Sequence, residues 1–199
     1  MTKNNTYKKQ FSQVKEFMQA CEQEIKTSPN FPDKKTVELR LNLIQEEVSE
    51  LAEAINENDT IEVIDAFVDI LYVTYGTCLS FGLEDDFYKA REILSTISEN
   101  DLFSKARIIL KTLYHALNGL RGAFEEESLG ETNYYLKTII NIICLNFKTE
   151  PYFDEVHFSN MTKVVDGKVL KNEFGKVMKP ITYKAPELNI VFDKNNGVF

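Results

Sequence analysis

The segment from Val63 to Val73 is the feature that most limits what this chain can fold into. It is apolar at every position except Asp65 and Asp69, and a helix that is apolar on all sides has to be buried. The two aspartates are four residues apart, so they lie on one side of that helix. A buried ionised carboxylate is unstable unless a cation pairs with it. Because no Lys or Arg occurs between Arg40 and Lys89, the partner is either a bound divalent cation or basic residues distant in the sequence.

The preceding segment predicts a second helix with one buried face. Asp33 or Thr36 can cap its start, and the pattern runs to about Asn56. Its apolar residues recur at alternating steps of three and four, as on one face of a helix: Leu41, Ile44, Val48, Leu51 and Ile55. Glu47 and Glu50 fall near the edge of this face. For these glutamates alone, a solvated acidic surface is the ordinary alternative.

The turn between these two helices brings their carboxylates together. Residues 56–59 form the turn, Asp59 caps the next helix, and Phe81-Gly82 ends it. Helices joined by so short a turn pack antiparallel. Glu47 and Glu50 would then face Asp65 and Asp69. Four carboxylates around one gap predict a Mg²⁺ or Mn²⁺ site, and the chemistry it indicates is phosphoanhydride hydrolysis by metal-activated water.

The rest of the chain is also mainly helical. Helical patterns cover residues 8–26, 87–98, 102–127, 131–147 and 152–163. Gly119 and Gly122 predict a break in the helix at 102–127. Asp166-Gly167 indicates a small hairpin, and the prolines and glycines that follow keep the tail irregular. We therefore expect a single all-α domain over residues 1–199.

Composition excludes several classes of protein. The chain has 31 acidic and 23 basic residues, which is unlike a general nucleic-acid binder. Its longest uncharged run, Ile70 to Leu83, is too short to span a membrane, and the N-terminus lacks a signal-peptide pattern. The three cysteines are far apart in the sequence. We expect a cytoplasmic protein. Residues 163–199 carry seven lysines against four acids, so a basic tail follows an acidic body.

Two blocks of sequence resemble a known superfamily. Glu46-Glu47-x-x-Glu50 followed by Asp65-x-x-x-Asp69, and the later strings from Glu155 to Lys163 and from Asp166 to Pro180, are similar to the all-α nucleoside triphosphate pyrophosphohydrolases. That group includes MazG, dimeric dUTPases and phosphoribosyl-ATP pyrophosphohydrolase. The resemblance implies a MazG-like helical bundle with its core at 8–86 and 151–188. A helical insertion would occupy about 87–150, and a short irregular arm would end the chain.

The resemblance also implies roles for individual residues. Glu47, Glu50 and Asp69 would be metal ligands, and Glu46 would activate or orient the attacking water. Many relatives have a glutamate where this chain has Ala66, and Asp65 can take its place as a ligand. Further candidates would contact the substrate. The arm and its neighbourhood supply Asn160, Lys163, Lys176 and Lys179 for phosphates, sugar or base, Arg40 is another phosphate candidate, and Tyr72 can stack on a base.

The implied reaction is Mg²⁺-dependent cleavage between the α- and β-phosphates, which gives a nucleoside monophosphate and pyrophosphate. We expect dUTP or another deoxynucleoside triphosphate as substrate. The alternatives are a phosphoribosyl-ATP pyrophosphohydrolase, or a non-catalytic helical interaction module with a structural metal site. No nucleic-acid polymer or membrane is expected as a partner. A homodimer is expected, or a monomer if the insertion completes the bundle.

Overall fold

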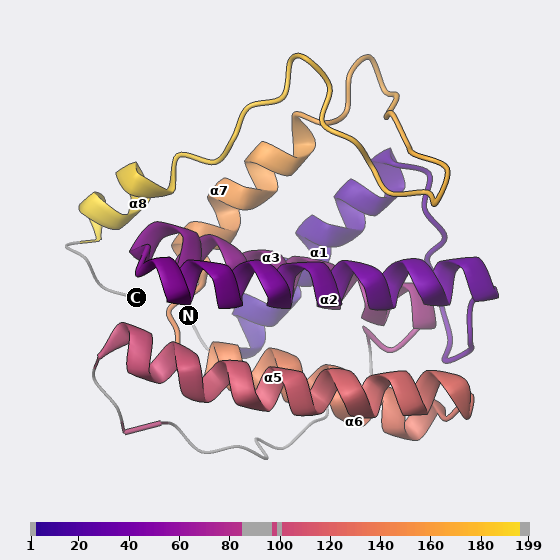
Figure 1. Ribbon diagram of the computed structural model, residues 1–199. Helices are drawn as coiled ribbons and strands as arrows, with labels where there is room; N and C mark the ends of the chain where they lie inside the picture. The colour runs from indigo at the N-terminus through magenta and orange to yellow at the C-terminus, as the bar shows by residue number, and fades with distance from the viewer. Residues whose placement is uncertain (1–2, 85–96, 99–100, 196–199) are drawn as a thin grey trace.

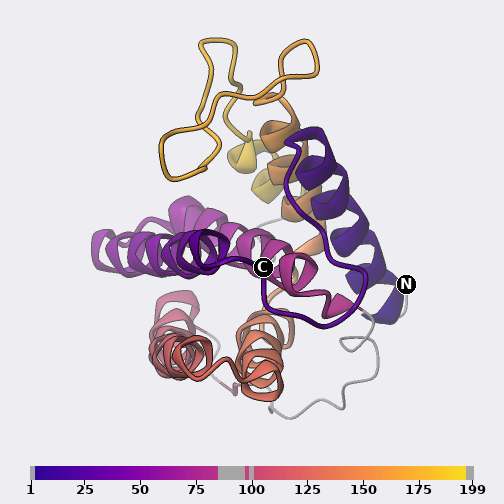
Figure 2. The same cartoon turned by 90° about the vertical axis from the view of Figure 1, so that its right-hand side faces the viewer.

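The computed structural model describes residues 3–84, 97–98 and 101–195 of this chain. Within that part the fold is all-α, with no strand, as expected from the sequence. The helices stack in three layers (Figures 1 and 2): α5 and α6 form one, α2 and α3 the next, and α1 and α7 lie on the opposite side together with the loop that leads to α8. In chain order the helices are α1 (Lys3–Ala20), α2 (Lys34–Glu57), α3 (Thr60–Phe81), α5 (Leu102–Glu125), α6 (Leu129–Cys144), α7 (Glu150–Met161) and α8 (Leu188–Lys194).

Helices α2 and α3 begin and end where the sequence predicts. The Asp33 carboxylate accepts a hydrogen bond from the Thr36 backbone N–H and caps α2. Asp59 accepts from two backbone N–H groups at the start of α3, and Gly82 ends α3 with a positive φ of 68°. Because the turn between the helices is so short, α2 and α3 pack antiparallel over their length, which fixes the register of their carboxylates.

Helix α3 is the central helix of the fold. Sixteen of its residues are buried, and α1, α2, α6, α7 and α8 all pack against it. By length and composition alone it could cross a membrane, but 83% of its most apolar window is buried against the other helices, as is usual for a core helix. Asp65 and Asp69 are exceptions on this helix, since each keeps partial exposure to solvent.

The insertion forms a helical hairpin, α5 and α6, that covers α2 and α3. The break predicted at Gly119 and Gly122 is wrong, because α5 is continuous through both. Gly119 instead allows close packing: a Cβ added there would lie 2.1 Å from the ring of Tyr135 on α6. The helix predicted at 87–98 lies largely outside the described residues.

The segment from Thr162 to Glu187, here called the arm, returns from α7 to the face of α2 and α3. Val165 and Lys168 exchange backbone hydrogen bonds around Asp166-Gly167, which confirms the predicted tight turn. Ser159 on α7 fastens the end of the arm by donating to the Lys184 carbonyl at 2.7 Å. The arm therefore crosses the open side of the α2–α3 pair (Figure 1).

Candidate functional site

A cavity of about 430 Å³ lies between α2, α3, α7 and the arm. Helices α2 and α3 contribute all of its carboxylates, whereas the arm contributes its lysines. The carboxylates are Glu46, Glu47, Glu50, Glu62, Asp65 and Asp69, and the lysines are Lys163, Lys176 and Lys179. Six carboxylates against three lysines leave a formal excess of negative charge. Segments that are far apart in the sequence thus form one strongly polar cavity.

Three of these carboxyl groups have a raised pKa. Burial is the main cause for Glu47, Asp65 and Asp69, because a low-polarity surrounding disfavours the ionised form. Negative neighbours add to it: Asp69 and Glu50 raise the pKa of both Glu47 and Asp65. For Asp69 the largest opposing influence is Lys163, which lowers the pKa. The lysines therefore only partly neutralise the cluster.

The arm lysines interact with different parts of the cavity. Lys176 Nζ donates to both oxygens of Glu46, at 2.5 and 2.6 Å. Lys163 Nζ donates to Asn160 Oδ1 at 2.6 Å, and Lys179 Nζ lies over the ring of Tyr183. In the part of the chain that the structure describes, no lysine forms an ion pair with Asp65 or Asp69, although Lys179 lowers the pKa of both and Lys163 that of Asp69. Distant basic residues therefore line the cavity without pairing directly with these two aspartates.

The donor set fits a hard divalent cation. All six acidic side chains offer oxygen ligands, and Asp65 Oδ1 is buried with no hydrogen-bond partner. The three lysines do not balance the charge, so a bound cation would relieve the remaining repulsion. Among the described residues, no three acidic, His or Cys side chains converge closely enough to hold a metal ion as they stand. The ligands Glu47, Glu50, Asp65 and Asp69 thus stay predictions that the donor chemistry supports.

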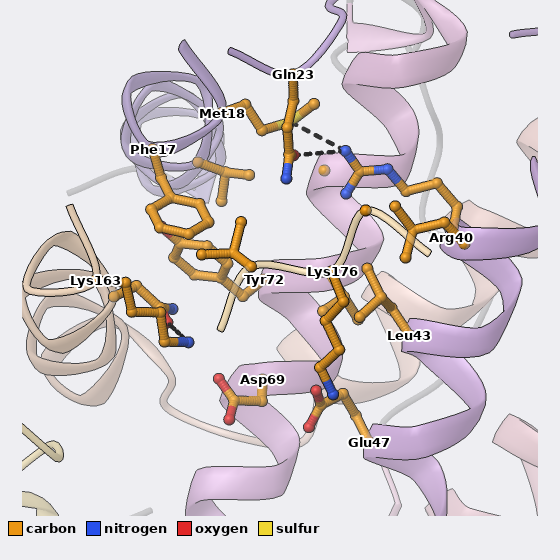
Figure 3. Close-up of a pocket in the computed structure, with 17 residues that line it drawn as sticks. Phe17, Met18, Gln23, Arg40, Leu43, Glu47, Asp69, Tyr72, Lys163 and Lys176 are labelled. Atoms are coloured by element: carbon orange, nitrogen blue, oxygen red, sulfur yellow. Dashed lines mark hydrogen bonds between the residues drawn. The ribbon is translucent and has the colours of Figure 1, made fainter. Parts of the chain in front are cut away.

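A second cavity, of about 110 Å³, continues from the carboxylates toward α1 (Figure 3). Glu47 and Asp69 lie at one end, and Arg40 lies at the other, beside Gln23 and Met18. The remaining wall is largely apolar and is made by α1, α2, α3 and the arm; it includes Val14, Phe17, Leu39, Leu43, Val73 and Val177. The site therefore has a polar, acidic end and a deeper, apolar end that contains one cation.

Tyr72 occupies the wall between the two ends. Its ring stacks on Phe153, and its hydroxyl forms a 3.0 Å hydrogen bond with His157 Nδ1. Burial is the main cause of the raised pKa of Tyr72 and of the lowered pKa of His157, so the pair is uncharged near neutral pH. Asn160 lines both cavities. One face of Tyr72 is thus occupied by packing against Phe153, which leaves only its other face for the base stacking expected from the sequence.

The structure brings every predicted site residue to one of the two cavities. Arg40 is nevertheless separated from the acidic end, where phosphates were expected (Figure 3). Sequence reasoning missed the residues of the apolar end, namely Val14, Phe17, Met18, Gln23, Leu39, Leu43 and Gly175. In the sequence, those of α1 are ordinary apolar positions of an amphipathic helix, and no signal distinguishes them from core residues.

Comparisons with known proteins agree with this architecture. Residues 14–99 match the family model of phosphoribosyl-ATP pyrophosphohydrolase, a segment that contains α2, α3 and their carboxylates. The uncharacterized protein L479 of Acanthamoeba polyphaga mimivirus is 32% identical over 148 residues, which cover 65% of this chain. The match spans 59% of that relative's length. No solved structure matches the chain. Residues 14–99 are therefore similar to a phosphoribosyl-ATP pyrophosphohydrolase domain, and the all-α architecture is consistent with a MazG-like helical fold.

Proposed function

We propose that this protein is a Mg²⁺-dependent pyrophosphohydrolase that cleaves a nucleoside triphosphate between its α- and β-phosphates. The products would be the monophosphate and pyrophosphate, and a deoxynucleotide such as dUTP is the leading substrate. One observation carries the proposal: six carboxylates of α2 and α3 share a cavity with three arm lysines. Carboxylates beside cations on a separate segment suit a ligand that is itself bound as a metal–phosphate complex. Members of the family typically use Mg²⁺.

Each group of residues has a distinct task in this reaction. Glu47, Glu50, Asp65 and Asp69 would hold the Mg²⁺, which lowers the pKa of bound water and neutralises phosphate oxygens. Lys163, Lys176 and Lys179 would bind the phosphates as point charges and orient them. Asn160, which has both a donor and an acceptor, would bind the sugar or base. The arm would exclude bulk water while the substrate is bound.

Glu46 would accept the proton of the attacking water. It is the most suitable carboxylate for this task because it is exposed at the rim of the cavity, whereas Glu47, Asp65 and Asp69 are partly buried. Its oxygens accept hydrogen bonds from Lys176 Nζ in the structure. Binding of a triphosphate would draw Lys176 to the phosphates and free Glu46 to act as general base.

The direct test is to identify the inorganic product from a panel of nucleotides. Purified protein should release pyrophosphate, and no orthophosphate, from at least one triphosphate, and only when Mg²⁺ is present. Glu47→Gln should abolish the release. Glu125→Gln is the matched control, because Glu125 is an exposed glutamate at the end of α5, outside both cavities. Failure to release pyrophosphate from any nucleotide in the panel would refute the proposal.

Phosphoribosyl-ATP is the second candidate substrate, since the matching family model is that of its pyrophosphohydrolase. The same assay distinguishes the two candidates when phosphoribosyl-ATP is included in the panel. A kcat/KM for phosphoribosyl-ATP above that for every deoxynucleotide would replace the leading candidate. Binding of Mg²⁺ and of nucleotides without any turnover would instead favour a non-catalytic module with a structural metal.

The homodimer and the cytoplasmic location stay predictions. Helices α5 and α6 cover one side of α2 and α3, which is compatible with the monomer that the sequence left as the alternative. Light scattering at several protein concentrations measures the oligomeric state directly.

A further inference from the structure

The deep end of the smaller cavity holds a charged side chain without a charged partner. Arg40 is 5% exposed, and among the described residues no carboxylate pairs with it. Its Nη2 donates to Gln23 Oε1 at 2.8 Å and lies 3.9 Å from Met18 Sδ, while its Nε has no partner. A buried guanidinium is stable only when acceptors satisfy its N–H groups. The unsatisfied Nε donor therefore indicates a ligand at this position.

The neighbour of Arg40 determines which chemistry such a ligand must have. A guanidinium only donates hydrogen bonds, so Gln23 has to present its carbonyl oxygen to Arg40. The Gln23 amide nitrogen is then left as a donor as well. The polar groups at this end are thus mainly N–H donors, and the matching ligand edge is one of hydrogen-bond acceptors.

Gly76 on α3 makes room for this arrangement. A Cβ at this position would lie 2.9 Å from Arg40 Nη1, so a larger residue would displace the guanidinium. Around it, the walls are the apolar side chains of Phe17, Leu43 and Val73. A narrow apolar cavity that ends in donors fits a flat heterocycle with carbonyl oxygens on its edge.

A phosphate group fits this end less well than a base does. Three lysines and six carboxylates suited to a divalent cation lie at the other end, so that end would take the triphosphate. A phosphate dianion beside Arg40 would have a single cation within apolar walls and would keep an uncompensated charge. With the triphosphate at the acidic end, the base is the part of the nucleotide left for the deep end.

We propose that Arg40, held by Gln23 and given room by Gly76, reads the base of the substrate and selects bases that have a carbonyl oxygen at the ring position where cytosine and adenine have an exocyclic amine. Uracil, thymine and guanine would be preferred over cytosine and adenine, whose exocyclic amine would face the N–H groups of Arg40. This inference rests on the proposed function, since it takes the bound triphosphate to lie at the acidic end. Uracil and cytosine give the sharpest comparison. At the same ring position uracil has a carbonyl oxygen, which accepts a hydrogen bond, and cytosine has an amine, which donates one.

The test measures binding separately from turnover. Calorimetry in Mg²⁺ would compare the non-hydrolysable α,β-imido analogues of dUTP and dCTP. The wild type should bind the uracil analogue at least about 10-fold more tightly, since an unpaired buried donor costs roughly one hydrogen bond or more. In Arg40→Met the two affinities should differ by less than about twofold, because the apolar side chain has nothing with which to discriminate. Gly76→Ala should reduce the preference by displacing the guanidinium.

Two controls keep the result interpretable. Arg121 on α5 also donates to a glutamine, Gln45 Oε1 at 2.8 Å, but on the surface, so Arg121→Met should keep the full preference. Arg40→Met should melt no lower than the wild type without ligand, because it removes a buried unpaired charge. A merely structural Arg40 would instead lower the melting temperature on substitution, and that result would count against the proposal.

The outcomes also distinguish this inference from the proposed function. Equal affinity of the wild type for both analogues, or a preference that survives in Arg40→Met, would overturn the base-reading role. So would an equal loss of affinity for both analogues in Arg40→Met, which would assign the residue to phosphate. A clear uracil preference without pyrophosphate release from any triphosphate would reject the proposed function alone.

Discussion

The contact between Glu46 and Lys176 makes the role of Glu46 measurable. Glu46→Gln keeps the size and polarity of the side chain but removes the proton acceptor. Loss of a general base lowers kcat typically by about 10²–10⁴-fold. The substitution also breaks the ion pair with Lys176, so the two effects have to be separated.

The geometry sets an upper limit on what the ion pair contributes. The side chains of Lys176 and Glu46 are 36% and 44% exposed, so water screens their attraction. Exposed pairs of this kind contribute at most about 1 kcal/mol, which corresponds to roughly fivefold in an equilibrium constant. A loss of 100-fold or more in Glu46→Gln, about 2.7 kcal/mol of the barrier, is beyond what release of Lys176 explains.

The assay is a double-mutant cycle with Glu46→Gln, Lys176→Met and the double variant. We expect Glu46→Gln to lower kcat while the affinity for Mg²⁺ and a non-hydrolysable analogue survives. Lys176→Met should mainly raise KM, because it removes a phosphate contact, and the double variant should show both losses. The reasoning fails if the two single variants lower kcat by the same factor and the double variant loses nothing more. In that case Glu46 acts only by positioning Lys176.

Three further predictions concern other parts of the site. Asp69→Asn should abolish pyrophosphate release while circular dichroism shows unchanged helicity, and full activity in this variant would remove Asp69 from the site. Burial lowers the pKa of His157, with Glu16 acting in the opposite direction. The contribution of His157 to folding stability should therefore be complete above the unfolded pKa of about 6.5 and be lost as the pH falls through the folded pKa. In urea unfolding, the change in the free energy of unfolding between pH 5 and pH 7.5 should be smaller for His157→Gln than for the wild type. Residues 160–185 should become protected from amide exchange when Mg²⁺ and a triphosphate analogue bind, whereas equal protection in both states would leave the arm a packing role only.

The contacts of the arm favour one of its two suggested roles, a segment that closes over the substrate rather than a fixed part of the core. If it only completed the core, its large apolar residues would be buried, yet Phe174 is 65% exposed and Ile181 is fully exposed. Val164, Val169 and Val177 do pack against the core. The arm is thus attached by a few apolar and polar contacts while three of its lysines line the cavity, which suits a segment that moves when substrate binds.

The sequence by itself determined the parts of this protein that depend on local pattern. The 3–4 spacing of apolar residues in α2, the caps Asp33 and Asp59, and the stop at Gly82 fix two helices within a residue or two of their positions. A short turn then forces these helices to pack antiparallel, so the alignment of Glu47 and Glu50 with Asp65 and Asp69 also follows from the sequence. Helical periodicity acts over one or two turns, and this is why it can be read without a structure.

Only the tertiary structure decided what surrounds those carboxylates. That Lys176 reaches Glu46 depends on how the arm crosses the open side of α2 and α3, which no local pattern encodes. The low helix propensity of glycine predicts a break at Gly119, but close packing against Tyr135 overrides that propensity and α5 is continuous. From the sequence, Arg40 was expected to contact a phosphate. It becomes a buried donor only because α1 and Gln23 pack around it and Gly76, which has no side chain, leaves room for the guanidinium. Such contacts between distant segments arise when the whole chain folds.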